Sequence, residues 1–414
     1  MPDTEQNLSW ESLQEEMIRW RRDLHQIPEI GLELPQTARY VRDVLDKYGI
    51  AYESLLEGNA VVAQIEGTKA GRQKPRVIAL RADMDGLAVR EETGLPFASE
   101  NGNMHACGHD AHMAMLLGAA LWLQVHRSEF SGIVKCFFQP GEERPGGALP
   151  MIREGCLENP RVDAIFGMHN GKISRELPDG AVGWRRGAIM ASVDVLTIKI
   201  KGKGGHGGYP EDCIDPITTA AEFIQAVQLL ISRELKPGDP AVLSFGSIKG
   251  GSSMNIIPDE VVIEGTCRNS SQETRKWLAR RIREVGEAVC GAHRAAFEIN
   301  HHFMYPPLIN DAAFSEAAAL SIAKVVGEER LYELKYPVMA GEDFACFAER
   351  LPAAYVFLSN MKPVGGRIYP HHSSRFDVDE RAFADGAEIF VQVALDFLAS
   401  APGEDESSLL HQKI

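Results

Sequence analysis

Residues 105–143 read HACGHDAHMAMLLGAALWLQVHRSEFSGIVKCFFQPGEE, and the expected architecture follows from this stretch. The long apolar run after CGHD predicts a buried helix from about residue 110 to 126, and IVKCFFQ predicts a buried strand after it. A loop (PGEERPGG), a helix (ALPMIREG) and another strand (VDAIFGMH) come next. Such alternation is typical of an α/β layer architecture with a mostly parallel sheet.

The order of the expected elements changes from about residue 188 onward. The pattern there predicts a strand (VDVLTIKIKG), a helix at 214–233, two strands (AVLSFGSIKGG and DEVVIEGTCR), a helix at 272–289 and a last strand (AAFEINHHF). This β-α-β-β-α-β order is that of a ferredoxin-like α+β domain. Helices at 11–26 and 35–47 and strands at 60–66 and 76–82 are expected before it, and alternation resumes from about 307 to a final helix at 379–399.

A chain of 414 residues is too long for one ordinary core, and these patterns predict a small domain inserted into a larger one. The larger domain is expected to span 1–187 and 305–400, with the inserted domain at 188–304. The last residues, 401–414, are polar and are expected to form a disordered tail.

Composition excludes several classes of partner. The net charge is −15 and no Lys/Arg-rich run is present, so nucleic acid is not an expected partner. The polar N-terminus lacks the features of a secretory signal, and no apolar run approaches the roughly 20 residues of a membrane span. Seven scattered cysteines are an odd count, which disfavours a disulfide framework. We therefore expect a cytoplasmic protein that does not enter a membrane.

Acids, histidines and a cysteine gather where expected strands end or helices begin. They lie in five segments: LRADMDG (80–86), HACGHDAH (105–112), FFQPGEE (137–143), FGMHN (166–170) and YPHHS (369–373). Ligands of open α/β sheets gather outside the carboxyl ends of the strands, so these segments could converge although they span nearly 300 residues.

The residue types in these segments suit a metal centre. Cys107 and His109 stand two apart before a helix, where a thiolate and an imidazole can chelate one ion. Glu142 and Glu143 follow a strand and a Pro-Gly pair, so one carboxylate can bind metal while the other stays free as a base. This mixture favours zinc, cobalt, nickel or manganese over calcium or magnesium. With two ions about 4 Å apart, a bridging water becomes a hydroxide near neutral pH and attacks a polarised carbonyl.

Each signal alone has an ordinary structural explanation. A Cys-x-His pair is more often a buried cysteine beside a histidine at a helix start, and paired glutamates usually lie in a solvated loop. We assign His105, His112 and His371 to such supporting roles, packing around or orienting the ligands. The order and context of the motifs together favour the metal site.

Motifs along the whole chain carry a family resemblance. They are, in order, RRDLHQIPEIGLE, RADMDGL, HACGHDAHMAMLLGAA, QPGEE, MHN, GKGGHGGYP, SMNIIPD, EGTCR, GEDF and HHS. Over roughly residues 16–398 the sequence resembles the aminoacylase and carboxypeptidase G superfamily, and most of all its hippurate hydrolase and auxin-amino-acid conjugate hydrolase branch. The resemblance implies a zinc-exopeptidase-like catalytic domain whose inserted domain serves as a lid and a dimerisation domain.

The same resemblance implies roles for individual residues. The implied ligands of two divalent ions, zinc or manganese before cobalt or nickel, are Cys107, His109, Glu143, His169 and His372. Glu142 would be the general base and acid, and Asp83 would orient or tune a ligating side chain. His206 matches a position that reaches the partner subunit's active site, and Asn255 and Arg268 match positions that grip the substrate carboxylate.

Three departures from the branch concern the pocket and leave the ligands in place. Ser374 stands where the branch usually has proline, and Glu211 stands where a histidine commonly occurs. His169 is followed by Asn170-Gly171, without the proline that often comes soon after it.

These observations lead to the hypothesis of a homodimeric enzyme that hydrolyses N-acyl-amino acids to a carboxylic acid and a free amino acid. Glu142 would take a proton from the metal-bridging water, His206 would stabilise the oxyanion, and Glu142 would return the proton to the leaving amine. Arg268 would select substrates with a free carboxylate. One alternative is deacetylation of an N-acetyl-diamino acid, and another is a metal-binding protein with a dead site. The presence of all five ligands and Glu142 argues against the dead site.

Overall fold

The computed structural model describes residues 8–71 and 74–400, which form two compact units. The larger unit contains the chain up to Gly187, Ile309–Tyr336 and the chain from Cys346. The inserted unit contains Ala188–Leu308 together with Pro337–Ala345. The short segment 337–345 thus groups with the inserted unit, although the sequence pattern assigned it to the larger domain. The tail expected at 401–414 lies outside the described residues.

The larger unit is built on an eight-stranded mixed sheet in the order β1-β2-β4-β3-β5-β16-β6-β15. Its strands are β1 (Ala51–Leu55), β2 (Ala60–Thr68), β3 (Val77–Asp83), β4 (Ser131–Gln139), β5 (Ala164–Asn170), β6 (Val182–Trp184), β15 (Leu331–Glu333) and β16 (Ala353–Leu358). The strands β4, β3, β5 and β16 run parallel to their neighbours within this group. Every residue of β3, β5 and β16 is buried, which explains why these strands are continuous apolar runs in the sequence.

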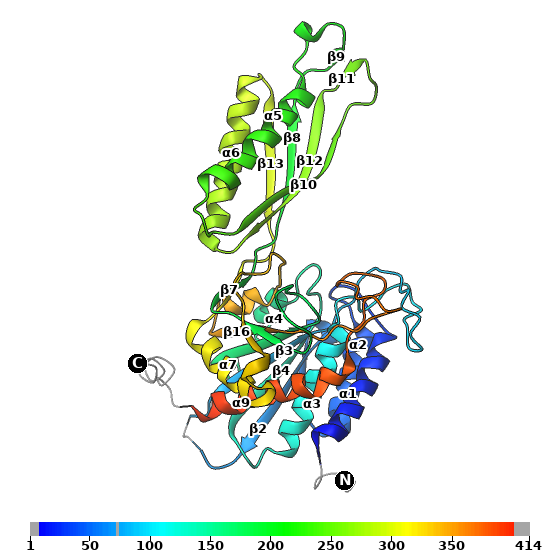
Figure 1. Ribbon diagram of the computed structural model, residues 1–414, viewed down its shortest axis with the longest axis vertical. Helices are drawn as coiled ribbons and strands as arrows, with labels where there is room; N and C mark the ends of the chain where they lie inside the picture. The colour runs from blue at the N-terminus through cyan, green and yellow to red at the C-terminus, as the bar shows by residue number, and fades with distance from the viewer. Residues whose placement is uncertain (1–7, 72–73, 401–414) are drawn as a thin grey trace. The chain divides into compact units, whose positions relative to one another are not determined.

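Helices cover this sheet. They are α1 (Trp10–His25), α2 (Pro35–Lys47), α3 (His109–Val125), α4 (Ala148–Arg153), α7 (Ala312–Val326) and α9 (Phe383–Ala399), and a short α8 (Ala345–Ala348) lies at the boundary of the units. Figure 1 shows α1, α3, α9 and α7 along the sheet, and α3 packs between α1 and α9. Because α3 is apolar on nearly all sides, it can be buried on all sides.

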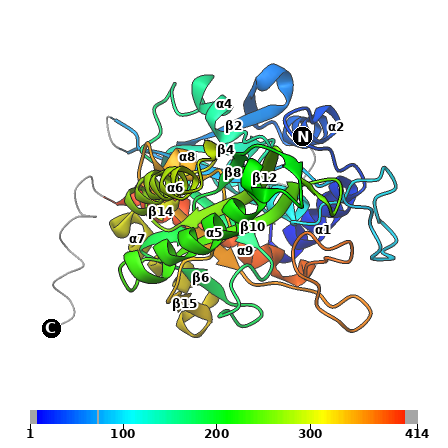
Figure 2. The same ribbon diagram turned by 90° about the horizontal axis from the view of Figure 1, so that it is seen from above.

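The inserted unit carries the ferredoxin-like order of elements. These are β8 (Asp194–Lys201), α5 (Pro216–Leu229), β10 (Ala241–Gly250), β12 (Glu260–Asn269), α6 (Gln272–Ala292) and β13 (Ala296–Phe303). The strands form an antiparallel sheet in the order β10-β12-β8-β13. Residues of β8 alternate between buried and more exposed, and its buried Leu196, Ile198 and Ile200 share a core with Phe223 of α5 and Ile282 of α6. Figure 2 shows α5 and α6 next to each other in this unit.

Short strands complete the description. In the inserted unit, β9 (Gly205–His206) pairs with β11 (Ile256–Ile257). The chain passes between the units at β7 (Gly187–Met190) and β14 (Leu308–Asn310). Among the described residues, none of the helices is long and apolar enough to cross a lipid bilayer.

Candidate metal centre

The carboxyl ends of neighbouring strands bring the predicted site residues together. β3 ends at Asp83, β4 ends just before the Pro140–Glu143 turn, and β5 ends at Asn170. These strands are parallel neighbours, so their ends meet at one edge of the sheet, and α3 begins nearby at His109.

Donor atoms from four different segments form one continuous cluster at this edge. Three groups, each with donor atoms within 4.8 Å of one another, are Cys107–His109–His169, Cys107–Glu143–His372 and His109–Glu142–Glu143. The groups share members, so the structure brings together all five predicted ligands and Glu142. The Cys107 sulfur lies 3.5 Å from Nε2 of His169, and Nε2 of His372 lies 3.0 Å from Oε1 of Glu143.

The histidines of the cluster present one ring nitrogen each toward it. Nδ1 of His109 donates to the carbonyl of Asp85 at 2.8 Å, and Nδ1 of His169 donates to the carbonyl of Asn170 at 2.7 Å. A carbonyl can only accept, so Nε2 is the atom left for a metal in both rings. Nε2 of His109 is buried and has no hydrogen-bond partner among the described residues. An unpartnered imidazole nitrogen beside a thiol and a carboxylate fits a borderline divalent ion.

Asp83 and His112 form a support behind the cluster. Oδ1 of Asp83 accepts from Nδ1 of His112 at 2.5 Å, and Nε2 of His112 accepts from the backbone N–H of Asn170 at 2.8 Å. Both His112 nitrogens are therefore occupied, although Asp83, His109 and His112 also lie close enough together to hold an ion. Oδ2 of Asp83 accepts from Arg81 and lies 3.7 Å from Nε2 of His109.

The other two histidines assigned to supporting roles lie apart from the donor groups. Nε2 of His371 donates to the carbonyl of Asn170 at 3.1 Å. His105 is buried, and neither of its ring nitrogens has a hydrogen-bond partner in the described part of the chain.

The electrostatics of the cluster differ from residue to residue. Burial, reinforced by the charges of Glu143 and Glu142, raises the pKa of the Cys107 thiol well above its ordinary value. Burial, with the neighbouring His112 and His371, holds the pKa of His169 far below its ordinary value, so this ring is neutral. Burial would also lower the pKa of His109, but the charges of Asp83 and Asp85 outweigh it and raise the pKa to about 10. Without a metal, the Cys107 thiol would therefore be protonated at neutral pH, and the His109 ring would carry a proton on both nitrogens.

Asp85 is a site residue that the sequence analysis did not single out. Its Oδ1 accepts from the backbone N–H of Glu142 at 2.9 Å, and its Oδ2 accepts from that of Glu143 at 3.0 Å. Oδ1 also lies 3.4 Å from Nδ1 of His109. One carboxylate thus fixes the turn that carries both glutamates. The sequence signal was the second acid of RADMDG, but its backbone partners leave no trace in the sequence.

The predicted residues of the inserted unit fall at two different ends of its sheet. His206 is exposed on β9, where it pairs with Ile256, and the next N–H along, that of Gly207, donates to the carbonyl of Asn255 at 2.8 Å. His206 and Asn255 are therefore neighbours. Nδ1 of His206 accepts from the N–H of Gly208 at 3.0 Å, which leaves Nε2 for another partner.

Arg268 lies near the opposite end of β12. It lies eight positions after Glu260, at which β12 begins next to the β9–β11 pair, and this corresponds to roughly 27 Å of strand. Arg268 is half-buried, and burial lowers the pKa of its guanidinium. One copy of the inserted unit therefore does not present Asn255 and Arg268 at the same place.

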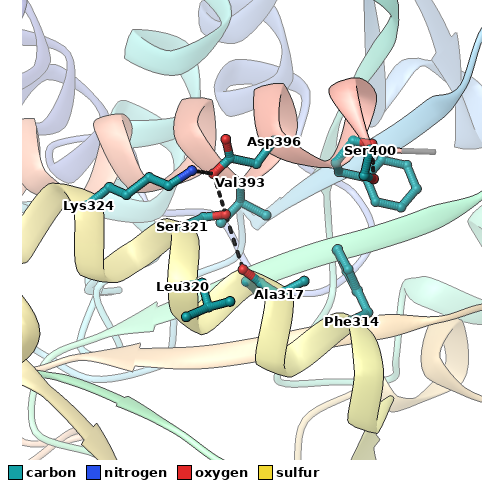
Figure 3. Close-up of a pocket in the computed structure, with 10 residues that line it drawn as sticks. Phe314, Ala317, Leu320, Ser321, Lys324, Val393, Asp396 and Ser400 are labelled. Carbon is teal, nitrogen blue, oxygen red and sulfur yellow. Dashed lines mark hydrogen bonds and ion pairs between the residues drawn. The ribbon is translucent and has the colours of Figure 1, made fainter. Parts of the chain in front are cut away.

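A groove elsewhere in the larger unit contains none of the predicted site residues. It lies between α7 and α9, has a volume of about 220 Å³ and is lined by Phe314, Leu320, Val393 and Phe397 among others. Figure 3 shows Asp396 accepting from Ser321 and from Lys324, both at 2.7 Å, so its polar groups satisfy one another.

Comparison with known proteins identifies the family to which this chain belongs. Residues 79–396 match the model of peptidase family M20/M25/M40. The chain belongs to this family. It is 37% identical to the N-acetylcysteine deacetylase of Bacillus subtilis over 92% of this chain and 96% of the relative. It is 34% identical to the IAA-amino acid hydrolase ILR1-like 2 of Arabidopsis thaliana over 96% of this chain and 89% of the relative.

A solved structure agrees with both the fold and the type of site. This M20-family chain is similar to the Bacillus subtilis YXEP protein, described as a dinuclear metal binding peptidase from the M20 family. The TM-score is 0.79 at 33% identity, and the match covers 94% of this chain and 100% of that one. The mixed sheet and the inserted antiparallel unit are therefore those of the family.

Proposed function

We propose that this protein is a dinuclear metal-dependent amidohydrolase that releases free amino acids from N-acyl-amino acids. The observation that carries the proposal is the cluster around Glu142, in which a buried, unpartnered His109 nitrogen faces the thiol and carboxylate groups. The proposed ligands are Cys107, His109, Glu143, His169 and His372. Two divalent ions held there, zinc or manganese before cobalt or nickel, would polarise the substrate carbonyl and acidify a bound water.

Glu142 is the proposed proton carrier. Its backbone N–H is held by Asp85, and its carboxylate lies in the same group as His109 and Glu143. It would take a proton from the attacking water and hand it to the leaving amine. Burial would raise the pKa of Glu143, but the hydrogen bond from His372 and the positive charge of His109 outweigh it and lower the pKa, as suits a ligand that must stay ionised. Asp83 would keep His112, and through it the Asn170 backbone, in place.

Two of the relatives support the proposed chemical class of substrate. One is named for the deacetylation of N-acetylcysteine and the other for the hydrolysis of IAA-amino acid conjugates, so both act on an amide that joins an acyl group to an amino acid. The half-buried Arg268 and the exposed Asn255 side chains are proposed to bind the free carboxylate of such a substrate. An N-acetyl-diamino acid is the alternative substrate, and its deacetylation would use the same chemistry.

A homodimer is proposed because the inserted unit separates its two sets of candidate residues. His206 and Asn255 lie at the end of the sheet remote from the chain entry at Asp194, whereas Arg268 lies next to that entry, where Cys267 pairs with Asp194. Side chains at the remote end are suited to serve a partner chain. There His206 would donate to the oxyanion formed during attack.

A panel assay tests the proposal. Metal-stripped protein would be supplied with one metal at a time and incubated with acetyl-, benzoyl- and indoleacetyl-amino acids, and the released amine would be measured. We expect turnover only with added metal. Full turnover by stripped protein, or by a Glu142→Gln variant, would rule the proposal out.

A further inference from the structure

One proposed ligand, His169, and two supporting histidines, His112 and His371, converge on the backbone of a single residue, Asn170. Its carbonyl accepts from Nδ1 of His169 and from Nε2 of His371, and its N–H donates to Nε2 of His112. The two peptide groups that flank Asn170 therefore set the orientation of all three rings. A shift of this residue would move the ligating nitrogen of His169.

The side chain of Asn170 reaches from the end of β5 to the start of α3. Its Nδ2 donates to the carbonyl of Gly108 at 2.9 Å, and the whole residue is buried. Gly108 stands between Cys107 and His109 and has a φ of 85°, a left-handed conformation that glycine adopts without strain. A Cβ on Gly108 would lie 2.4 Å from Oδ1 of Asn170, so the carboxamide is pressed against this turn.

The carboxamide itself is only half satisfied. Oδ1 of Asn170 is buried and has no hydrogen-bond partner among the described residues. Burying an unsatisfied acceptor costs free energy, whereas a leucine of similar size would bury none. The Nδ2 bond to Gly108 is thus the interaction that an amide provides here and an apolar side chain would not.

We propose that Asn170 is a positioning residue that fixes the Cys107–Gly108–His109 turn relative to His169. Donors on the two sides of this joint, the Cys107 sulfur and Nε2 of His169, lie 3.5 Å apart. The side-chain carboxamide of Asn170 maintains that distance and thereby the affinity of the site for metal. The inference rests on the proposed function, because it takes these residues as ligands.

The test is metal binding by the variant Asn170→Ala, measured on stripped full-length protein. Zinc affinity would be measured by competition with a chromophoric chelator, and the cobalt-loaded form would be examined for its thiolate-to-cobalt charge-transfer absorption. We expect affinity to fall about 10- to 100-fold, as for other residues that orient metal ligands, and the charge-transfer band to weaken. The variant Asn170→Leu removes the same donor without leaving a cavity, and it should behave alike.

Asn310→Ala is the matched control. Asn310 is also buried, and its Nδ2 donates to the carbonyls of Arg185 and Tyr355, both at 2.9 Å. Neither of these residues is a proposed ligand. The thermal unfolding of Asn310→Ala should be perturbed like that of Asn170→Ala, while its zinc affinity stays at the wild-type value. An equal loss of affinity in Asn310→Ala, or wild-type affinity in both Asn170 variants, would overturn the inference alone. Failure of the wild-type protein to bind metal would overturn the proposed function together with it.

Discussion

The guanidinium of Arg21 donates from Nε to the carboxylate of Asp110 at 2.8 Å, and both side chains are buried. Asp110 directly follows His109 in α3, and Arg21 also binds Asp377 at 2.9 Å and Glu380 at 3.2 Å. One residue of α1 thus connects the helix that begins with a proposed ligand to the segment that follows His372.

Replacement of Arg21 should destabilise the larger unit strongly. Arg21→Met leaves buried carboxylates without their cation, a loss of about 3–5 kcal/mol in the free energy of unfolding for a broken buried pair. Arg19→Met is the control, since Arg19 pairs with Glu16 at the surface, where such pairs contribute little. Urea denaturation of both variants measures the difference. Equal free energies of unfolding for the two variants would contradict this account of Arg21 and its carboxylate partners.

The free energy of unfolding contributed by the buried charges around Arg21 should depend on pH in both directions. Burial would raise the pKa of Asp110, but Arg21 and His25 outweigh it and lower the pKa far below the ordinary value, so its contribution is full above about pH 4 and is lost as pH falls further. For His25, burial would lower the pKa, but the charge of Asp110 prevails and raises it. Its contribution is therefore full below about pH 6.5 and is lost as pH rises through the raised value.

The variant His25→Asn isolates the second effect. Thermal unfolding midpoints measured from pH 4 to pH 10 should converge for the variant and the wild type as the pH rises. A gap between the two curves that stays constant over this range would show that His25 does not gain a proton on folding.

Metal binding should release protons. Because the pKa of His109 is raised to about 10 and the Cys107 thiol is also protonated in the absence of metal, both must lose a proton to become ligands. Zinc affinity should therefore fall as the pH is lowered. Calorimetric titrations in two buffers of different ionisation enthalpy count the protons directly, and identical heats in both buffers would refute the prediction.

The two adjacent glutamates should fail in different ways. Glu142→Gln should keep its metal and lose turnover by a factor of about 10² to 10⁴, because a positioned proton carrier is removed. Glu143→Gln should lose metal instead. Metal content and kcat measured together distinguish the two, and the opposite pattern would mean that their roles are exchanged.

His206 should act in the partner's active site. His206→Ala should lower kcat by about 10² to 10³, the effect of removing one oxyanion donor, without changing metal content. Mixing this variant with Glu142→Gln should restore activity, because exchanged dimers contain one site with both groups intact. If exchange is demonstrated by mass spectrometry and activity stays absent, His206 does not act in trans.

The grouping of the candidate ligands could largely be predicted because most of them stand at the boundary of a buried helix or strand. Cys107 and His109 stand at the start of the apolar helix, Glu143 follows β4, and His169 lies at the end of β5; the burial of these strands is visible as continuous apolar sequence. Parallel neighbours then bring these ends to one edge. The supporting role of His112 also agrees with the geometry, since both of its nitrogens are occupied.

Other features could not be predicted because they depend on tertiary pairing. Asp85 binds backbone groups 57 and 58 residues away, and such partners have no side-chain signature. The position of β16 between β5 and β6 is likewise absent from the pattern, since β6 has only three residues. The motifs that contain Asn255 and Arg268 give the order of these two residues along the chain. They do not show that β12 extends between them and holds them apart.

The place of β16 in the sheet determines when this protein can fold during its synthesis. β16 pairs with β5 on one side and with β6 on the other, yet it leaves the ribosome only after the whole inserted unit has been made. The first 187 residues therefore emerge with an open edge at β5 and without His372. The core of the inserted unit comes from the uninterrupted stretch 188–308, so the nascent chain can form this core before it completes the sheet of the larger unit.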